Sequence, residues 1–481
     1  MALSGIIDSA ASSIVQILIT GGDPQSSLTP YTCFPFKQFE ASAFFVEPPM
    51  GKGKGYYYLL TNAHELEDAR QLYIRFPPGS KTQYPVEIEF ICRERDLCLL
   101  SIPKSSLPGE VKTLPLLRYS YPLSPGTQVL ALGYPLGEHT LKTSTGIISG
   151  YTTTNKDPHV GVGNLDSFRH TGTLYQITPT LNHGNSGGVL LNLSGEVVGI
   201  PSGGNEDANN INYAVPIYQY YNLAIEDKIV HVPNLGVSLS KTTPTILSYY
   251  KCKGHGMLVC EKYPDSTLDE LEVNDIWTNL SWPGCEVSID STGLARLLVD
   301  GVEFPLTLTL LQIAELIPMN IDIQLRGYRD GKLLTWNTPY TYRRTARLSY
   351  HYPIFEKYPY LILAGGCWVQ FTLNSFYYLQ DSVGDEKSFP PNAECRSVDI
   401  FRPCVVLTSI FPGTKLERDD IFKRGTVLAT LNDREIYTIE DLQQVVTTAK
   451  LLVFRSSRRL LEIITLEEAR YDDRQVKKNY L

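Results

Sequence analysis

A series of short, apolar, β-type runs, separated by glycine and proline from about residue 9 to residue 229, constrains the fold more than any other feature of this sequence. These runs are residues 43–46, 56–60, 86–92, 97–102, 128–132, 146–151, 189–191 and 197–200. Short strands at regular spacing are typical of all-β sandwiches and barrels. Helical periodicity occurs only near the end of this region, where residues 217–226 predict a closing helix.

Beyond residue 231 the pattern changes to strand, turn and helix, and it occurs twice. Thr309-Leu-Leu-Gln312 and Thr438-Ile-Glu-Asp441 each predict the capped start of an amphipathic helix. Arg329-Asp-Gly331 predicts a hairpin turn between two strands. We therefore expect a β-rich domain over residues 1–230, followed by two α+β domains over residues 231–340 and 341–481.

Composition excludes several classes of partner and cofactor. The 481 residues include 43 basic and 51 acidic ones, a net charge of −8, which gives no support for a nucleic-acid partner or an anionic membrane. We expect no membrane partner, since no apolar run reaches the roughly 18 residues of a spanning helix, and no secretory signal. Nine cysteines without a Cys-x-x-Cys pair predict neither a disulfide framework nor a zinc site. We expect no metal, no other cofactor, and a reducing intracellular compartment, either cytoplasm or nucleus.

The segment Leu181-Asn-His-Gly-Asn-Ser-Gly-Gly-Val-Leu190 carries the strongest chemical signal. A serine hydroxyl becomes a nucleophile when a base takes its proton, and the resulting oxyanion needs N–H donors. Gly184 allows the backbone to turn its N–H toward the same point as the N–H of Ser186, while the two following glycines leave room for a substrate strand. Taken alone, the segment could also be a flexible turn.

Two upstream segments supply the partners that such a serine needs. His64 ends an apolar strand, and Asp96 stands at the head of another β-run. A buried carboxylate in that position can accept a hydrogen bond from the imidazole and fix its tautomer. Each residue alone is usually structural, but the order histidine, aspartate, serine, with such segments around each, indicates a nucleophilic triad.

Together these segments resemble the HtrA/Deg serine proteases over nearly the whole of the first 230 residues. The resemblance is carried, in order, by Thr61-Asn-Ala-His64, Asp96-Leu-Cys-Leu-Leu100, Val129-Leu-Ala-Leu-Gly-Tyr-Pro-Leu-Gly137, Thr143-Ser-Thr-Gly-Ile-Ile-Ser149, Gly184-Asn-Ser-Gly-Gly188, Gly195-Glu-Val-Val-Gly-Ile200 and Asn212-Tyr-Ala-Val-Pro-Ile217. It implies a mainly β chain, in which a chymotrypsin-like pair of six-stranded β-barrels precedes two α+β PDZ-like domains.

The same resemblance implies the roles of individual residues. His64 is the expected general base, Asp96 its orienting partner and Ser186 the nucleophile. The expected oxyanion hole is the Gly184, Asn185 and Ser186 segment, acting through the N–H groups of its first and last residues. Secreted digestive relatives carry aspartate where this chain has Asn185, so no proteolytic activation is expected.

The primary specificity pocket is expected to have Thr180 at its base, with Leu181 and Ile200 nearby. Strong selection of arginine or lysine requires an acidic residue at the pocket base. Thr180 therefore predicts small or medium aliphatic residues before the scissile bond.

The two carboxyl-terminal units resemble PDZ domains. In the first, Gly256, Met257, Leu258 and Val259 are expected to form the loop and strand that accept a peptide by β-augmentation. In the second, the corresponding strand, residues 404–407, lacks a clear glycine loop, so a packing or assembly module is the alternative. Residues 358–368 also resemble the insertion before the last PDZ-like unit of plant and fungal nuclear or organellar Deg proteins, and of some large-virus homologues.

The resemblance implies an ATP-independent serine endopeptidase that acts on unfolded or damaged proteins, with PDZ domains that tether substrates or support assembly. Two alternatives remain open: a chaperone or scaffold with an inactive site, and a narrow-specificity viral processing protease in a virion or infected-cell cytoplasm. Family members also imply a homo-oligomer, a trimer or a multiple of it. Residues 31–36 are a candidate contact for that assembly, or else a hairpin packed on its own barrel.

Overall fold

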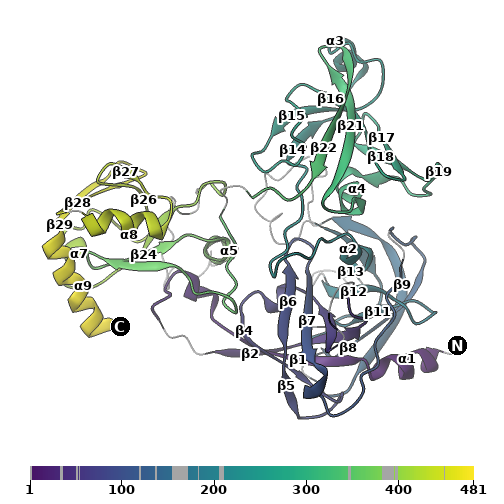
Figure 1. The fold of residues 1–481 in the computed structure, drawn as a ribbon, viewed down its shortest axis with the longest axis horizontal. Helices are drawn as coiled ribbons and strands as arrows, with labels where there is room; N and C mark the ends of the chain where they lie inside the picture. Colours follow the sequence, from purple (N-terminus) through teal and green to yellow (C-terminus); the bar gives the residue numbers. More distant parts are fainter. Residues whose placement is uncertain are drawn as a thin grey trace. The chain divides into compact units, whose positions relative to one another are not determined.

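The structure, a computed structural model, describes residues 3–32, 36–49, 53, 55–118, 121–135, 138–153, 172–182, 184–204, 211–344, 348–381, 395, 399–448 and 450–481 (Figure 1). The chain divides into two compact units. The first contains residues 1–19, 39–66 and 71–343, and the second contains residues 20–38, 67–70 and 344–481. The predicted division into three domains stays a prediction.

The first sheet has seven strands in the order β5-β4-β1-β2-β3-β7-β6. Its strands are β1 (Ile14–Gly21), β2 (Lys37–Val46), β3 (Tyr56–Thr61), β4 (Ala69–Arg75), β5 (Gln83–Pro85), β6 (Glu87–Cys92) and β7 (Leu97–Pro103), and helix α1 (Leu3–Ala11) precedes them. The family resemblance implied a six-stranded barrel here. The observed sheet is open and has a seventh strand, because the short β5 pairs with the outer side of β4.

The second sheet is a closed six-stranded barrel in the order β10-β13-β12-β11-β8-β9, as expected. It consists of β8 (Gln128–Gly133), β9 (Lys142–Thr153), β10 (Thr173–Ile177), β11 (Val189–Leu191), β12 (Val197–Gly204) and β13 (Asn212–Pro216). Apart from Val86, which lies between β5 and β6, the β-type runs of the sequence lie in strands of these two sheets. The fold class predicted from their spacing is therefore confirmed.

The third sheet has nine strands, and two short helices accompany it. These are β14 (Val237–Ser240), α3 (Pro244–Tyr249), β15 (Met257–Lys262), β16 (Ile276–Trp282), β17 (Cys285–Ile289), β18 (Leu294–Val299), β19 (Val302–Glu303), β20 (Leu308–Thr309), α4 (Leu310–Leu316), β21 (Ile321–Arg329) and β22 (Lys332–Tyr340). One hydrophobic core runs from the second barrel into this sheet and includes Tyr175, Tyr218, Trp277 and Tyr340. The sheet and the second barrel are therefore packed as one body.

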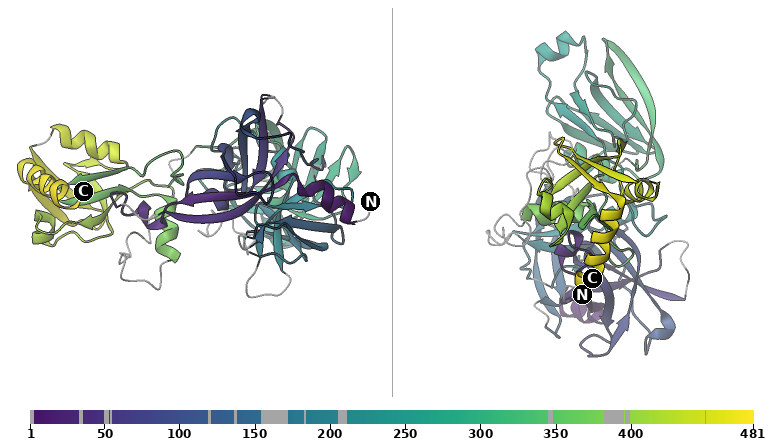
Figure 2. Two further views of the ribbon diagram at one scale, coloured as in Figure 1. Left: turned by 90° about the horizontal axis from the view of Figure 1, so that it is seen from below. Right: turned by 90° about the vertical axis from the view of Figure 1, so that its left-hand side faces the viewer.

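The fourth sheet has seven strands and belongs to the second unit. It contains β23 (Tyr360–Leu363), β24 (Gly366–Gln370), β25 (Val405–Ile410), β26 (Thr426–Leu431), β27 (Arg434–Glu435), β28 (Leu451–Ser456) and β29 (Leu461–Thr465), with helices α5 (Leu373–Asp381), α7 (Lys415–Asp419), α8 (Ile439–Thr448) and α9 (Leu466–Tyr480). In Figure 2 the carboxyl-terminal helix α9, in yellow, lies beside this sheet, where it contacts β23 and β29.

The local signals behind the two predicted helices are confirmed. Thr309 accepts the N–H of Gln312, whose side chain in turn accepts the N–H of Thr309, a reciprocal cap at the start of α4. Thr438 and Asp441 make the same exchange at α8. The predicted hairpin turn at residues 329–332 joins β21 to β22.

The closing helix of the first region is shorter than predicted. Residues 217–226 were expected to be helical, but α2 covers only Tyr218–Tyr221. Asn222 ends it, because its side chain donates to the carbonyl of Glu315 and its own carbonyl accepts the N–H of Met319. These contacts with the region around α4, which lies beside α2 in Figure 1, replace the next helical turn.

Tyr31, in the segment considered for assembly, packs within its own unit. Its hydroxyl donates to Ser409 Oγ at 2.6 Å, and its ring lies 5.3 Å from that of Phe411. Residues 33–35 of that segment lie outside the described residues. Tyr31 thus contacts β25 and the residue after it and not a barrel strand, and the predicted role of the segment in assembly stays a prediction.

None of the described helices is both long enough and apolar enough to span a membrane.

The partly buried carboxylate of Asp473 joins helix α9 to the fourth sheet, although burial disfavours its charged form. Asp473 Oδ1 accepts the N–H of Gly365 at 3.0 Å, in the turn between β23 and β24. Burial raises the pKa of Asp473 to about 6, although the Gly365 N–H opposes that rise. An unfolded aspartate has a pKa of about 3.9, so the folded unit binds this proton more tightly and loses stability as pH rises from about 4 to 6.

We predict that Asp473→Asn stabilises the second unit above pH 6, by roughly 1 kcal/mol after allowance for partial exposure, because asparagine keeps the acceptor and removes the charge. Hydrogen exchange of the α9 amides, corrected for intrinsic rates, measures this effect. Glu440→Gln on the exposed side of α8 should keep the wild-type pH dependence. Equal protection of wild type and Asp473→Asn at pH 5 and pH 8 would contradict the prediction.

Candidate active site

Strand pairing in the first sheet brings His64 and Asp96 together. Strand β3 ends at Thr61, and His64 opens the short 3₁₀ helix η2 (His64–Leu66) that follows. Asp96 lies in the turn just before β7, with a left-handed φ of 52°. Because β3 and β7 are antiparallel neighbours, with Thr61 opposite Cys98, the end of one strand meets the start of the other.

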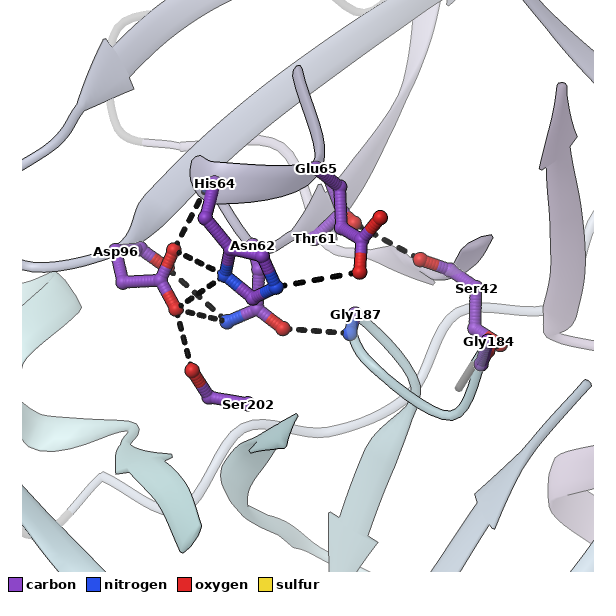
Figure 3. Close-up of polar contacts among 9 residues, drawn as sticks. All are labelled: Ser42, Thr61, Asn62, His64, Glu65, Asp96, Gly184, Gly187 and Ser202. Atoms are coloured by element: carbon purple, nitrogen blue, oxygen red, sulfur yellow. Dashed lines mark hydrogen bonds and ion pairs between the residues drawn. The ribbon is translucent and has the colours of Figure 1, made fainter. Parts of the chain in front are cut away.

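The Asp96 carboxylate holds the histidine by both its ring and its backbone (Figure 3). Ring nitrogen Nδ1 lies 2.9 Å from each carboxylate oxygen of Asp96, and the His64 backbone N–H donates to Oδ1, also at 2.9 Å. Asp96 is 3% exposed, whereas the His64 side chain is 41% exposed. This geometry fixes the ring orientation and leaves Nε2 as the accessible nitrogen.

Two residues that sequence analysis did not single out complete the contacts of this carboxylate. Ser202 Oγ donates to Asp96 Oδ2 at 2.5 Å, and Asn62 Nδ2 donates to the same oxygen at 2.9 Å. Asn62 stands within the Thr61-Asn-Ala-His64 motif, which was a local signal for it. Ser202 comes from β12 of the second barrel, and nothing in its own sequence neighbourhood pointed to Asp96.

Asn62 also connects the aspartate to the serine loop. Its Oδ1 accepts the N–H of Gly187 at 2.6 Å, and its side chain is fully buried. One amide therefore bonds to the Asp96 carboxylate through its nitrogen and to the residue after Ser186 through its oxygen. The hydrogen bonds of Asn62 therefore link Asp96 to Gly187, in the loop that carries Ser186 (Figure 3).

The serine loop fits closely against the first sheet. Ser42 donates its hydroxyl to the carbonyl of Gly184 and its N–H to the carbonyl of Ser186. Gly187 has a φ of 77°, and a Cβ there would lie 2.1 Å from the Ser42 carbonyl oxygen and 2.2 Å from Thr61 Oγ1. Only glycine fits at this position. The close approach of Ser42 and Thr61 therefore accounts for Gly187, whereas the sequence had suggested that this glycine leaves room for a substrate strand.

The N–H groups of the predicted oxyanion hole differ from one another. Within the described residues, those of Gly184 and Ser186 have no hydrogen-bond acceptor, and Gly184 has a φ of 93°. The N–H of Asn185, in contrast, donates to the carbonyl of Asn182 at 3.0 Å. Among the described residues, Gly184 and Ser186 thus offer two N–H donors without an acceptor, and these are the two groups that the resemblance assigns to the oxyanion hole.

His64 Nε2 contacts a glutamate in this structure. Glu65 Oε1 lies 3.2 Å from Nε2, and the structure records no hydrogen bond between that nitrogen and Ser186 Oγ, both of which it describes. Removal from water lowers the pKa of His64, but the charge of Asp96 and then contact with Glu65 outweigh this, so that the pKa stands well above its ordinary value.

The residues assigned to the specificity pocket do not form one accessible wall. Thr180 is exposed, and its N–H donates to Ser144 Oγ at 2.9 Å. Leu181 is half-buried against the hydrophobic core. Ile200 is 0% exposed, because it is part of the core where β12 packs, so its assignment as a pocket-lining side chain is wrong.

The predicted peptide-binding strand is not a free edge. Leu258 in β15 pairs with Ser240 on β14 and with Ile276 on β16, so backbone groups on both sides of the strand have partners. A Cβ at Gly256 would lie 2.4 Å from the Trp277 carbonyl oxygen, which explains that glycine by packing. Residues 256–259 therefore cannot accept a peptide by β-augmentation, and the free edge on this side of the sheet is β14.

The residue before Asp96 is fixed by the third sheet. Arg95 Nη1 lies 3.8 Å from Oε1 of Glu315 on α4, and both side chains are buried. Glu315 also accepts the N–H of Thr173 and the side-chain amide of Gln219. Burial raises the pKa of Glu315, and the Arg95 charge opposes that rise. No local signal pointed to the contact between Arg95 and Glu315, because a lone glutamate in an amphipathic helix usually faces solvent.

The arrangement has the parts of a nucleophilic acyl-transfer site: a serine, an oriented imidazole and two free N–H donors. Among the residues that the structure describes, no group of three or more histidine, cysteine, aspartate or glutamate side chains could hold a metal ion.

Comparisons with known proteins point to one group of enzymes. Residues 41–200 match the family described as "Trypsin-like peptidase domain". The chain is 28% identical over 242 residues to serine protease HTRA3 of Mus musculus, covering 45% of this chain and 49% of that protein. It is 34% identical over 142 residues to serine protease HTRA1A of Danio rerio, covering 30% of this chain and 27% of that protein. The chain thus spans about half the length, or less, of these curated relatives.

Among solved structures, the chain is similar to the HtrA-type protease AlgW with a decapeptide, with a TM-score of 0.47 and 20% identity, over 72% of this chain and 99% of that chain. The crystal structure of the serine endoprotease from Yersinia pestis gives a TM-score of 0.42, also with 20% identity and the same two coverages.

We predict that Asn62→Ala lowers the reactivity of Ser186 toward a fluorophosphonate roughly 10- to 100-fold, because the Gly187 N–H and the Asp96 carboxylate each lose a buried partner, a loss that typically costs about 1–3 kcal/mol. The rate of covalent labelling measures this. Asn192→Ala, at a turn outside the site, is the matched control and should label at the wild-type rate. Wild-type labelling of Asn62→Ala would show that the amide does not support the site.

Proposed function

We propose that this chain is a serine endopeptidase of the HtrA/Deg family that uses His64, Asp96 and Ser186 as its triad. The match of residues 41–200 to the trypsin-like peptidase domain and the similarity to HtrA proteases support this proposal. The observation that carries this proposal is the contact of both Asp96 carboxylate oxygens with His64 Nδ1 at 2.9 Å, in the network that Asn62 extends to the serine loop.

In the proposed reaction, Asp96 keeps the Nδ1 proton of His64 in place, so that Nε2 of the neutral ring takes the proton of Ser186 Oγ. The oxygen attacks the scissile carbonyl, and the N–H groups of Gly184 and Ser186 stabilise the oxyanion that forms. His64 then returns the proton to the leaving amine, and water hydrolyses the acyl-enzyme by the same route. Ser202 and Asn62 would hold Asp96 in place throughout.

The proposed substrates are unfolded or damaged proteins and peptides, cleaved without ATP after small or medium aliphatic residues. The absence of an acidic side chain at Thr180 supports that preference. We further propose a homo-oligomer, a trimer or a multiple of it, in a reducing intracellular compartment. The free thiols of six described cysteines support the choice of compartment; they are Cys92, Cys98, Cys252, Cys260, Cys285 and Cys367.

A second candidate function is a binding or chaperone scaffold whose site is at rest. The contact between Glu65 and His64 Nε2 favours it, because a base whose reactive nitrogen is already engaged cannot accept the serine proton. A viral processing protease would share the chemistry of the first candidate, and a profile of its cleavage sites would reveal a few sites instead of many.

We predict that Ser186→Ala abolishes both cleavage of a chemically denatured protein and labelling by a fluorophosphonate, with a loss on the order of 10³-fold or more. Gel-based cleavage assays and mass spectrometry of the label measure the two effects. Ser194→Ala, an exposed serine in the turn after β11, is the matched control and should retain both activities. Cleavage at the wild-type rate by Ser186→Ala would exclude the proposed nucleophile.

A further inference from the structure

The glutamate that follows His64 occupies the nitrogen that the proposed mechanism needs. Glu65 Oε1 lies 3.2 Å from Nε2, on the opposite side of the ring from Asp96 (Figure 3). His64 and Glu65 both belong to the short η2 helix, and the Glu65 side chain is 20% exposed. Within the described part of the chain, His64 is the only side chain in ion-pair contact with Glu65.

The number of N–H groups on the ring determines whether a neutral imidazole or an imidazolium fits between Asp96 and Glu65. A neutral imidazole carries one N–H, and here Asp96 accepts it from Nδ1. Nε2 would then present a lone pair to the Glu65 carboxylate, which is also an acceptor, and the two would repel. With both carboxylates ionised, both contacts are favourable only when the ring is an imidazolium with an N–H on each nitrogen. The structure therefore has the geometry of a cation between two carboxylates.

The other groups around the ring do not alter this balance. Asp96 comes from the turn before β7 and Glu65 from η2, and these are the two charged groups in contact with the ring among the described residues. Asn62 and Ser202 are neutral and donate to Asp96. Within the same part of the chain the structure records no lysine or arginine in an ion pair with Glu65, so the imidazolium is the cation that this carboxylate contacts.

We propose that Glu65 is a built-in competitor of Ser186 for His64 Nε2, which holds the site in a protonated resting state until its side chain turns away. This inference rests on the proposed function, since it concerns the same histidine acting as a base. An imidazolium cannot take the serine proton, and an Nε2–H donated to Glu65 leaves no lone pair for Ser186 Oγ. Release requires loss of one proton to solvent and rotation of Glu65 away from the ring.

The inference has a defined consequence for pH dependence. A second carboxylate stabilises the imidazolium, so the free enzyme must reach a higher pH before His64 becomes a base. The acidic limb of kcat/KM reports that ionisation in the free enzyme. Glu65→Gln keeps the size of the side chain and removes its charge, so the acidic limb should move to lower pH.

The test compares pH profiles of kcat/KM for the full-length wild type, Glu65→Gln and Glu87→Gln, with a fluorogenic peptide. In Glu65→Gln we expect the acidic limb to fall by about 0.5–1 pH unit, and the rate on that limb to rise by about 3- to 10-fold. At high pH the two profiles should converge. Glu87 is exposed on β6 and is the matched loss of charge, so its profile should equal that of the wild type.

A second measurement separates this inference from the proposed function. In Ser186→Ala and in Ser186→Ala/Glu65→Gln, the low-field proton resonances of the His64 ring can be titrated without any catalysis. We expect the midpoint to fall by about 0.5–1 unit when Glu65 is replaced. An unchanged midpoint, or superimposable rate profiles, overturns the inference. A shifted midpoint in a chain that cleaves no protein supports the inference about Glu65 and overturns the proposed function alone.

Discussion

The carboxylate of Asp96 is the group on which the rest of the site depends, because segments from two sheets meet at its two oxygens. It accepts hydrogen bonds from the backbone and ring of His64, from Asn62 and from Ser202. A buried carboxylate is costly unless donors surround it, and each of these donors also positions a part of the site. The hydrogen bonds that stabilise the buried Asp96 carboxylate thus also orient His64 and link it to the serine loop.

This carboxylate is in turn held by structure that extends beyond the protease-like sheets. Its neighbour Arg95 reaches the buried Glu315 of α4, and Glu315 also binds Thr173 at the start of β10. The backbone at Asp96 has a left-handed φ, a conformation that surrounding contacts must maintain. Within the first unit, therefore, the third sheet supports the residue that orients His64. The Glu65 carboxylate then contacts Nε2 on the opposite side of the same ring.

Much of this arrangement could be predicted from the sequence, and what could not has a common cause. Strand spacing gave the mainly β class, and reciprocal caps gave α4 and α8, because both signals are local. Local patterns also singled out His64, Asp96 and Ser186. The roles of Ser202 and Glu315, and the close packing of Gly187 against the first sheet, were missed because each depends on contacts between distant segments. The peptide strand at residues 256–259 was wrong for the same reason, since only the sheet order shows that β14 covers it.

The most direct test of the central claim is a crystal structure of the full chain after reaction with a peptidyl phosphonate. The account predicts a covalent bond from Ser186 Oγ to phosphorus, with a phosphonate oxygen accepting the N–H groups of Gly184 and Ser186. It also predicts Glu65 turned away from His64 Nε2, and the Asp96 contacts unchanged. A phosphonate bound elsewhere, or a Ser186 adduct in which the two N–H groups point away from the phosphonate oxygen, would contradict it.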